Sequence, residues 1–324
     1  MPTQTAVVLG CKGQDGSLMC KSLLEANCKV IGLIRNQLNN HSNLHKLGIV
    51  NDVELKFGDI RNFDDVSGLI EDYQPECVYN LASQSSVGKS FINPQESLES
   101  IVGGTLNILN VAKTLDYSGR LFFAGSSEMF GNTESGADSE HIQNPISPYA
   151  IGKQASFNLV KLYRDIHSLN CVTGILFNHE SHLRDKSFVT QKIIQGAISI
   201  ANKKFTKKIK LGNINVIRDW GWAPEYVEAM QVVANSKNKK DYVICTGKPN
   251  SLKLFIDKLF KYFNLNWQDH IEIDTALFRP SEIEISYGNP LPIFEDLRWK
   301  AKEDIDSIIN KLIINSDMNK DLLS

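Results

Sequence analysis

Short apolar runs recur through the first half of the chain and alternate with stretches of helical character. They cover residues 5–9, 29–34, 54–57, 76–80, 120–124 and 172–177. Runs such as TAVVLG and CKVIGLI contain few polar residues, which indicates strands buried on both faces, as in a parallel sheet covered by helices on each side. The alternation therefore predicts an α/β fold with a doubly wound parallel sheet of the Rossmann type.

The pattern changes after Phe177. Residues 188–201 have the spacing of a long helix, mixed elements continue to Trp299, and residues 305–314 are typical of an amphipathic helix that docks on the rest. We expect these segments to form a smaller, mixed α/β lobe.

The predicted division of the chain has two parts. The Rossmann domain covers residues 1–177, with strand contributions from about 208–250, and the substrate lobe covers residues 178–324. No linker rich in Pro, Gly or Ser separates them, so we expect the two parts to interleave rather than hang on a tether.

Composition and charge exclude several classes of function. The 324 residues have 42% hydrophobic content and a formal net charge of −2, so no overall field attracts nucleic acid or an anionic membrane. No apolar run approaches the roughly 20 residues of a membrane span. The first residues, MPTQTAVVLG, do not resemble a signal peptide. We expect a cytoplasmic protein with neither nucleic-acid nor membrane partners.

The six cysteines stand singly, without a C-x-x-C pair. This spacing favours reduced thiols over a disulfide framework or a zinc site. We therefore predict no bound metal.

A glycine-rich turn follows the first strand. Gly10, Gly13 and Gly16 bracket Gln14 and Asp15 directly before a predicted helix. Glycines at this place allow a tight turn and bring backbone N–H groups and the helix N-terminus close to a pyrophosphate. The turn predicts a dinucleotide site; the alternative is an ordinary strand-to-helix turn.

The second strand ends at Arg35, where a cofactor with a free ribose 2′-hydroxyl would usually meet Asp or Glu. A guanidinium suits a 2′-phosphate, which favours NADP over NAD; the alternative is a solvated surface arginine. Asp59, followed by Ile60, ends the third strand and could accept from the adenine amino group. Small residues after the fourth strand would let the backbone run beside the cofactor, at Leu81, Ala82, Ser83 and Ser85.

A catalytic group is predicted where the fifth strand ends and the next helix begins. Tyr149 and Lys153 are four residues apart, so they share one helix face. The ammonium could then stabilise a phenolate and make Tyr149 a usable base near neutral pH. Ser126 could hydrogen-bond the same substrate hydroxyl.

Over most of residues 5–299 the chain resembles the extended short-chain dehydrogenase/reductases and, among them, the GDP-mannose 4,6-dehydratase family. The matching stretches are GxxGQDGS at 10–17, VYNLASQSSV at 78–87, SSEMFGN at 126–132, SPYAIGK at 147–153, GILFNHES at 174–181, FVTQKI at 188–193, LGN at 211–213, RDWG at 218–221, YVEAM at 226–230 and FRPSE at 278–282. The FNHES and RDWG stretches are far more specific than the glycines.

The resemblance implies a reaction. Simple dehydrogenases and 4-epimerases of the superfamily need only the Ser or Thr, Tyr and Lys, whereas Glu128 beside them implies an elimination. NADP⁺ would take hydride from C4 while Tyr149 removes the hydroxyl proton, and Glu128 would abstract the acidified C5 proton. Water would leave from C6 with help from Glu128 or through Ser127, and hydride would return to C6.

The resemblance also implies binding residues. His179 and Arg184 match late cofactor contacts, beside Tyr149 and Lys153. The positions that match the surroundings of a nucleotide diphosphate-sugar are Ser85, Ser127, Asn178, Lys192, Leu211, Arg218, Arg279 and Glu282. Several are cations, as a pyrophosphate requires when the overall charge gives no help.

Departures from the family pattern leave the substrate open. The family continues NHES with Pro-Arg-Arg-Gly, whereas residues 182–185 here read HLRD, and Gln191 and Asn36 each replace an arginine. We expect GDP-mannose as the substrate, with GDP-N-acetylglucosamine or a GDP-heptose as alternatives. A nucleotide-sugar 4-epimerase or 4-keto reductase and a non-catalytic NADP-binding protein are the other classes.

Proteins that resemble this family pair through helices beside the sheet. The corresponding segments here are residues 94–115 and 147–170. We therefore expect a homodimer or a homotetramer.

Overall fold

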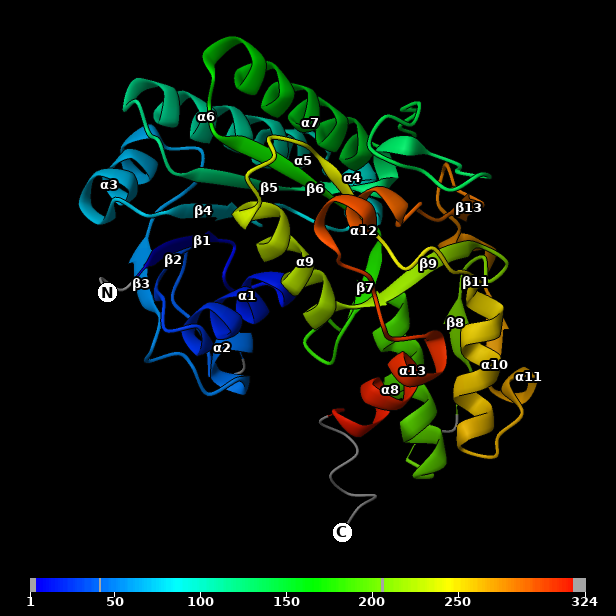
Figure 1. The fold of residues 1–324 in the computed structure, drawn as a ribbon. Coiled ribbons are helices and arrows are strands. Elements are labelled where there is room, and N and C mark those ends of the chain that lie inside the picture. The colour runs from blue at the N-terminus through cyan, green and yellow to red at the C-terminus, as the bar shows by residue number, and fades with distance from the viewer. Residues whose placement is uncertain (1–3, 41, 205–206, 317–324) are drawn as a thin grey trace.

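A seven-stranded parallel sheet organises the larger part of the molecule (Figure 1). The computed structural model describes residues 4–40, 42–204 and 207–316. The strands, in the order β10-β6-β5-β4-β1-β2-β3, are β1 Thr5–Leu9, β2 Lys29–Ile34, β3 Glu54–Phe57, β4 Cys77–Asn80, β5 Arg120–Ser126, β6 Cys171–Leu176 and β10 Tyr242–Ile244. Successive strands are added to one side of β1 up to β3 and to its other side from β4 onwards. Ligands bind at such a switch point, here between β1 and β4.

Helices cover both faces of this sheet, as the apolar strands predicted. In Figure 1, α6 (Gly104–Thr114) and α7 (Pro148–His167) lie above it, and α1 (Gln14–Glu25) and α9 (Ala223–Asn235) lie below. In the core below the sheet, side chains of α1 and α9 pack on β1. In the core above it, side chains of α3 (Phe63–Tyr73) and α6 pack on the other face of β1. The predicted doubly wound Rossmann fold is confirmed.

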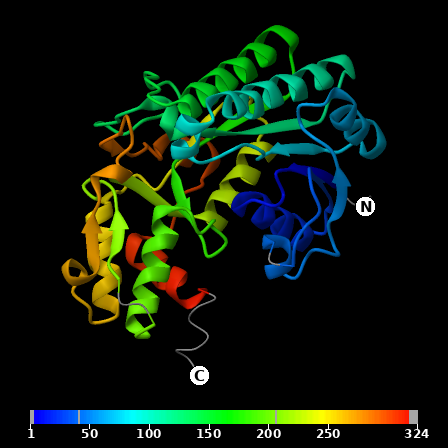
Figure 2. The same ribbon diagram turned by 180° about the vertical axis from the view of Figure 1, so that it is seen from behind.

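A smaller mixed α/β part follows, also as predicted. Figures 1 and 2 both place α8, α10 and α13 together at the end of the molecule away from β3. Its strands are β7 Asn178–Glu180, β8 Ile209–Leu211, β9 Ile217–Trp222, β11 Pro249–Ser251, β12 Ile271–Ile273 and β13 Ile285–Ser286. Its helices are α8 Val189–Ala201, α10 Leu252–Tyr262, α11 Trp267–His270 and α13 Ile305–Ile314. One apolar core joins α8, α10 and α13 to β9.

The chain passes back from the smaller part to the larger one. After β9, helix α9 packs under the large sheet and β10 extends its edge beside β6. Later, Ile293 of α12 (Leu291–Leu297) and Trp299 join the lower core. The domain boundary after residue 177 stays a prediction.

The helix expected over residues 94–115 contains a wider turn. It consists of α5 (Pro94–Leu98), a π-helical turn (Glu99–Gly103) and α6. The carbonyl of Ile101 in this turn accepts a hydrogen bond of 3.1 Å from Ser156 of α7. Such turns occur often beside functional sites, and this one packs against the helix that carries Tyr149 and Lys153.

Two further observations concern the described ranges alone. None of their helices is long and apolar enough to cross a membrane, and they contain no cluster of His, Cys, Asp or Glu side chains that could hold a metal ion. All six cysteines are free thiols, and all but Cys28 are buried.

Candidate functional site

A cavity of about 520 Å³ opens at the carboxyl ends of the sheet strands, between the two parts of the chain. Most residues predicted for the site line it. They are Gly13, Gln14, Asp15, Gly16, Leu81, Ser83, Ser85, Ser126, Ser127, Glu128, Tyr149, Lys153, Asn178, His179, Arg184, Lys192, Leu211, Arg218, Arg279 and Glu282. Tertiary folding therefore brings the predicted cofactor, catalytic and substrate residues to one space.

The glycine turn is built by close backbone contacts. Gly10 has φ +86°, and a Cβ there would lie 2.7 Å from the backbone of Leu81 and Ala82. A Cβ on Gly16 would lie 2.1 Å from the carbonyl oxygen of Gly10. Gly10 does not line the cavity itself, but these contacts hold the start of α1 at its wall, where its free N–H groups favour an anion.

Arg35, Asp59 and Ile60 lie outside the main cavity. Arg35 is exposed. Nε and a terminal nitrogen of Arg61 donate to the two carboxylate oxygens of Asp59 at 3.0 and 2.7 Å, and this interaction holds the pKa of Asp59 below its usual value. The charge of Arg35 acts in the same direction. Sequence reasoning missed Arg61; the signal was a second cation two residues after Asp59.

Glu128 and Ser126 come from the end of β5. A short 3-10 helix, Ser127–Phe130, begins there, and Oγ of Ser126 accepts a hydrogen bond of 3.3 Å from the backbone N–H of Glu128. Burial raises the pKa of Glu128, while the charges of Arg279 and Arg218 lower it. The turn thus holds a carboxyl group of raised pKa in the cavity.

Tyr149 and Lys153 lie in the first turns of α7, which begins at Pro148. Oγ of Ser147 caps this helix by accepting from the N–H of Ala150 at 3.1 Å. The sequence predicted that Lys153 stabilises the phenolate of Tyr149, and that role stays a prediction. Burial raises the pKa of Tyr149 to about 12, against the effect of the neighbouring Ser126 hydroxyl.

The lysine itself points to a backbone acceptor. Nζ of Lys153 donates to the carbonyl of Ala124 at 2.8 Å and lies 5.8 Å from the centre of the Tyr149 ring. Burial lowers the pKa of Lys153 to about 8. The ammonium is therefore close to Tyr149 but is held by the strand end rather than by the phenol.

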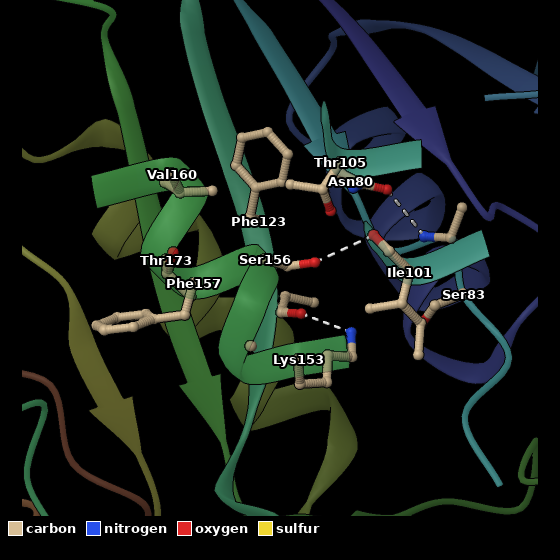
Figure 3. Close-up of a pocket in the computed structure, with 13 residues that line it drawn as sticks. Asn80, Ser83, Ile101, Thr105, Phe123, Lys153, Ser156, Phe157, Val160 and Thr173 are labelled. Atoms are coloured by element: carbon tan, nitrogen blue, oxygen red, sulfur yellow. Dashed lines mark hydrogen bonds between the residues drawn. The ribbon is translucent and has the colours of Figure 1, made fainter. Parts of the chain in front are cut away.

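Lys153 also lines a second, small cavity, together with Ala82 and Thr173. Figure 3 shows the side chains around it. Its volume is about 10 Å³, close to the least that one water molecule needs. Oγ1 of Thr173 is buried there without a hydrogen-bond partner among the described residues.

Two arginines and a glutamate of the smaller part form a charged cluster that acts on Glu128. Arg218 of β9 is 6% exposed, and its guanidinium lies 3.0 Å from Oε1 of Glu282. The more exposed Arg279 contacts the same oxygen at 3.4 Å. Two guanidinium groups thus share one carboxylate, which leaves donors for an anionic ligand.

The residues after β6 form another wall. His179 of β7 is 5% exposed and contacts Asp15 of α1. The guanidinium of Arg184 lies 4.0 Å from the centre of the Phe188 ring, and its Nε is 3.7 Å from Oε2 of Glu180. This wall joins the glycine turn to the smaller part.

Lys192 of α8 and Leu211 of β8 complete the far end of the cavity. Nζ of Lys192 donates to the carbonyl of Lys210 at 2.7 Å. Several lining residues carry no recognisable chemistry in the sequence and were missed, among them Val87, Gly88, Val189, Gly212, Val216, Trp220, Leu252 and Leu277. Only the packing of the two parts brings them to the cavity.

Comparisons of sequence place the chain among known proteins. A family model described as GDP-mannose 4,6 dehydratase matches residues 7–312. GDP-mannose 4,6 dehydratase 1 of Arabidopsis thaliana is 36% identical over 98% of this chain and 90% of its own length. The human GDP-mannose 4,6 dehydratase is 30% identical, over 96% and 91%. That of Vibrio cholerae is 29% identical, over 97% and 93%.

Solved structures share the fold at low sequence identity. A dTDP-glucose 4,6-dehydratase of Bacillus anthracis in complex with NAD has a TM-score of 0.84 at 17% identity, covering 98% of this chain and 97% of that one. RMD of Pseudomonas aeruginosa complexed with NADPH has a TM-score of 0.78 at 20% identity, over 96% and 97%. A UDP-glucose 4-epimerase of Thermus thermophilus complexed with NAD has a TM-score of 0.83 at 20% identity, over 96% and 98%.

Proposed function

Because the chain belongs to the GDP-mannose 4,6-dehydratase family, we propose that it removes water from a GDP-hexose, in the first place GDP-mannose. The product is the 4-keto-6-deoxy sugar, and NADP is recycled within the reaction. The observation that carries the proposal is the position of Glu128 in the same cavity as Ser126, Tyr149 and Lys153. A 4-epimerase or a 4-keto reductase does not need that carboxyl group.

The cavity suits a nicotinamide dinucleotide, which several proteins of the same fold contain. Side chains at Gly10 and Gly16 would collide with the backbone, so the turn leaves its N–H groups open to a diphosphate. Arg35, whose charge acts on Asp59, and Arg61, which is paired with Asp59, supply positive charge for a ribose 2′-phosphate, which supports NADP. When bound, the cofactor supplies a hydride acceptor for C4 and a hydride donor for C6.

Tyr149 and Ser126 act on the C4 hydroxyl. Tyr149 takes the hydroxyl proton as C4 becomes a ketone, and Ser126 hydrogen-bonds the same oxygen. Because burial holds the pKa of Tyr149 at about 12, ionisation needs positive charge nearby. Lys153, 5.8 Å from the ring centre, supplies part of that charge.

Glu128 carries the elimination. The C4 ketone makes the C5 hydrogen acidic, and Glu128 takes that proton. The C6 oxygen then leaves as water after it receives a proton from Glu128 or through Ser127. A carboxyl group whose pKa is raised by burial suits both steps, since its carboxylate is a stronger base than a solvated one and its acid form can return the proton.

The substrate diphosphate is assigned to Arg218 and Arg279, which Glu282 holds side by side. Lys192, Leu211 and Asn178 belong to the same cavity and are assigned to the nucleotide and sugar. GDP-N-acetylglucosamine and a GDP-heptose would undergo the same chemistry at C4, C5 and C6, so the sugar must be identified by experiment.

The test is mass spectrometry of nucleotide sugars incubated with the purified protein and either NADP⁺ or NAD⁺. The set contains GDP-mannose, GDP-N-acetylglucosamine, a GDP-heptose, UDP-glucose and dTDP-glucose. We expect loss of one water from one GDP-sugar and, in heavy water, deuterium at C5. A change of C4 configuration or redox state with C6 still oxygenated would overturn the role of Glu128.

A further inference from the structure

Motifs that are far apart in the sequence meet around His179. Strand β7 runs parallel to β9, with His179 opposite Gly221. The Tyr226 ring of α9 stacks on the imidazole, with 4.6 Å between the ring centres and 25° between the planes. A Cβ on Gly221 would lie 2.1 Å from the Tyr226 ring. Glycine at 221 therefore leaves the space in which Tyr226 covers the histidine.

Both ring nitrogens of His179 face acceptors. Nδ1 lies 2.7 Å from the carbonyl oxygen of Phe177, and Nε2 lies 3.0 Å from each carboxylate oxygen of Asp15. A carbonyl oxygen cannot donate, and Asp15 also accepts a hydrogen bond of 3.0 Å from Gln14. Each of these acceptors is satisfied only when the ring nitrogen that faces it carries a proton.

The charged groups around Asp15 and His179 favour an ionised Asp15. Burial opposes a charge on Asp15, yet the charge and hydrogen bond of His179 lower the pKa of Asp15 to about 2. Arg184 acts on Asp15 in the same direction, and Lys153 of α7 is a further cation that interacts with it. Tyr226 is uncharged, because burial raises its pKa.

The segment that contains His179 also hydrogen-bonds Gln14, the residue before Asp15. Nε2 of Gln14 donates to the carbonyl of His179 at 3.2 Å, and Oγ of Ser181 donates to Oε1 of Gln14 at 2.9 Å. Gln14 and Asp15 form the first turn of α1, directly after the glycine turn. The segment after β6 thus holds the helix start to which the cofactor diphosphate is assigned.

A carboxylate in this turn creates an electrostatic problem. The N-terminus of a helix attracts a diphosphate through its dipole and its free N–H groups, but an uncompensated Asp15 would repel that anion. We propose that His179 is a positioning residue whose imidazolium neutralises Asp15 and holds the first turn of α1, so that the turn can bind the cofactor diphosphate. This inference rests on the dinucleotide cofactor proposed above.

The charge state is tested first on the unaltered protein. Long-range ¹⁵N NMR of the histidine side chains should show both nitrogens of His179 protonated at pH 7, assigned by the loss of that signal in His179→Gln. A neutral tautomer at pH 7 would overturn the proposal, and this result does not depend on whether any variant folds.

The effect of His179 on the diphosphate site is tested by measuring cofactor binding. Calorimetric dissociation constants are measured for NADP⁺ and for 2′-AMP, which carries the 2′-phosphate but no diphosphate. In His179→Gln we expect NADP⁺ to bind roughly 30-fold more weakly or worse, as when one partner of a buried charge pair is removed, with 2′-AMP unchanged. His167→Gln, at an exposed histidine of α7, is the matched control and should bind both as the unaltered protein does.

The double variant separates charge from packing. If His179 acts through Asp15, then Asp15→Asn with His179→Gln should bind NADP⁺ more tightly than His179→Gln alone. Equal binding of NADP⁺ by His179→Gln and the unaltered protein, or no gain in the double variant, would overturn the inference. Failure of the unaltered protein to bind NADP⁺ or NAD⁺ would instead overturn the proposed cofactor.

Discussion

At the scale of single residues, burial decides what the ionisable groups of the cavity can do. The same loss of water raises the pKa of Glu128 and that of Tyr149, and lowers that of Lys153. Each shift favours the neutral form. The site therefore contains a carboxyl group ready to exchange protons and a phenol that ionises only when positive charge is close to it.

Replacement of Glu128 by Gln separates the two halves of the proposed reaction. The amide cannot take the C5 proton, so C4 oxidation should proceed while dehydration slows by ~10²- to 10⁴-fold. NADPH absorbance at the site should rise without a 6-deoxy product in the mass spectrum. Glu134→Gln, at an exposed carboxylate, should keep full activity. Full activity in Glu128→Gln would refute the assignment.

Replacement of Tyr149 by Phe should affect the first step of the proposed reaction, the oxidation at C4. Without the phenol the C4 hydroxyl loses its base, so hydride transfer itself should slow by ~10²- to 10⁴-fold, and no NADPH absorbance should appear in a single turnover. Tyr163→Phe is the control on the same helix, since the Tyr163 hydroxyl bonds Asn110 rather than the cavity. A normal burst of NADPH in Tyr149→Phe would exclude Tyr149 as the base.

At the scale of elements, contacts between distant segments set the geometry of the site. The turn between β1 and α1 packs on the end of β4, and β7 holds the first turn of α1. The periodicity of apolar residues predicted most of these strands and helices closely. It could not show that the wider turn over Glu99–Gly103 exists, because that turn depends on tertiary contacts such as the bond between Ser156 and Ile101.

The glycine turn should not tolerate a methyl group at residue 16. The added Cβ would lie 2.1 Å from a backbone oxygen, so Gly16→Ala should lower the free energy of unfolding by about 1–3 kcal/mol and abolish NADP⁺ binding. Gly68→Ala is the control, because its Cβ meets nothing within 4 Å on helix α3. It should stabilise by about 0.5–1 kcal/mol. Urea unfolding and calorimetry measure both effects.

The contact between α1 and β7 predicts a dependence of stability on acid. Asp15 has an ordinary pKa of 3.8 and a pKa of about 2 in the fold. Its contribution is therefore complete above pH 4 and is lost as the pH falls through about 2, an effect of about 2 kcal/mol. Urea unfolding from pH 5 to 2 should show a steeper loss in the unaltered protein than in Asp15→Asn. Parallel pH profiles would contradict the ion pair.

At the scale of the whole molecule, helix α7 leaves several large apolar side chains exposed. Ile151, Leu162 and Ile166 of α7 are between 48% and 67% exposed. This helix and the neighbouring segment 94–115 are the surfaces expected to pair two copies of the chain, and apolar side chains in such a place are typical of an interface.

Charges on this face should separate the copies. Leu162→Glu combined with Ile166→Glu would put two carboxylates into the expected contact, so the sedimentation coefficient should fall to that of a monomer. Tyr262→Glu, which changes an equally exposed apolar residue of the smaller part, should leave the assembly intact. If the unaltered protein already sediments as a monomer at all concentrations, the predicted dimer or tetramer is wrong.

The sequence by itself determined the Rossmann fold and the position of six of the seven sheet strands, all but β10, while its resemblance to a known family supplied most residues of the candidate site. The fold, the glycine turn and the pair of Tyr149 and Lys153 depend on local properties: apolar runs buried on both faces, glycines at a tight turn, and a spacing of one helical turn. Such properties are written in neighbouring residues and need no knowledge of distant contacts.

Only the tertiary structure decided the contact of His179 with Asp15, the raised pKa of Tyr149 and the grouping of Arg218 with Arg279 around Glu282. Each depends on groups that lie far apart in the chain, such as Asp15 and His179, or Arg218 and Glu282. Electrostatic energies depend on distance and on exclusion of water, and neither quantity exists until the two parts of the chain close around the cavity.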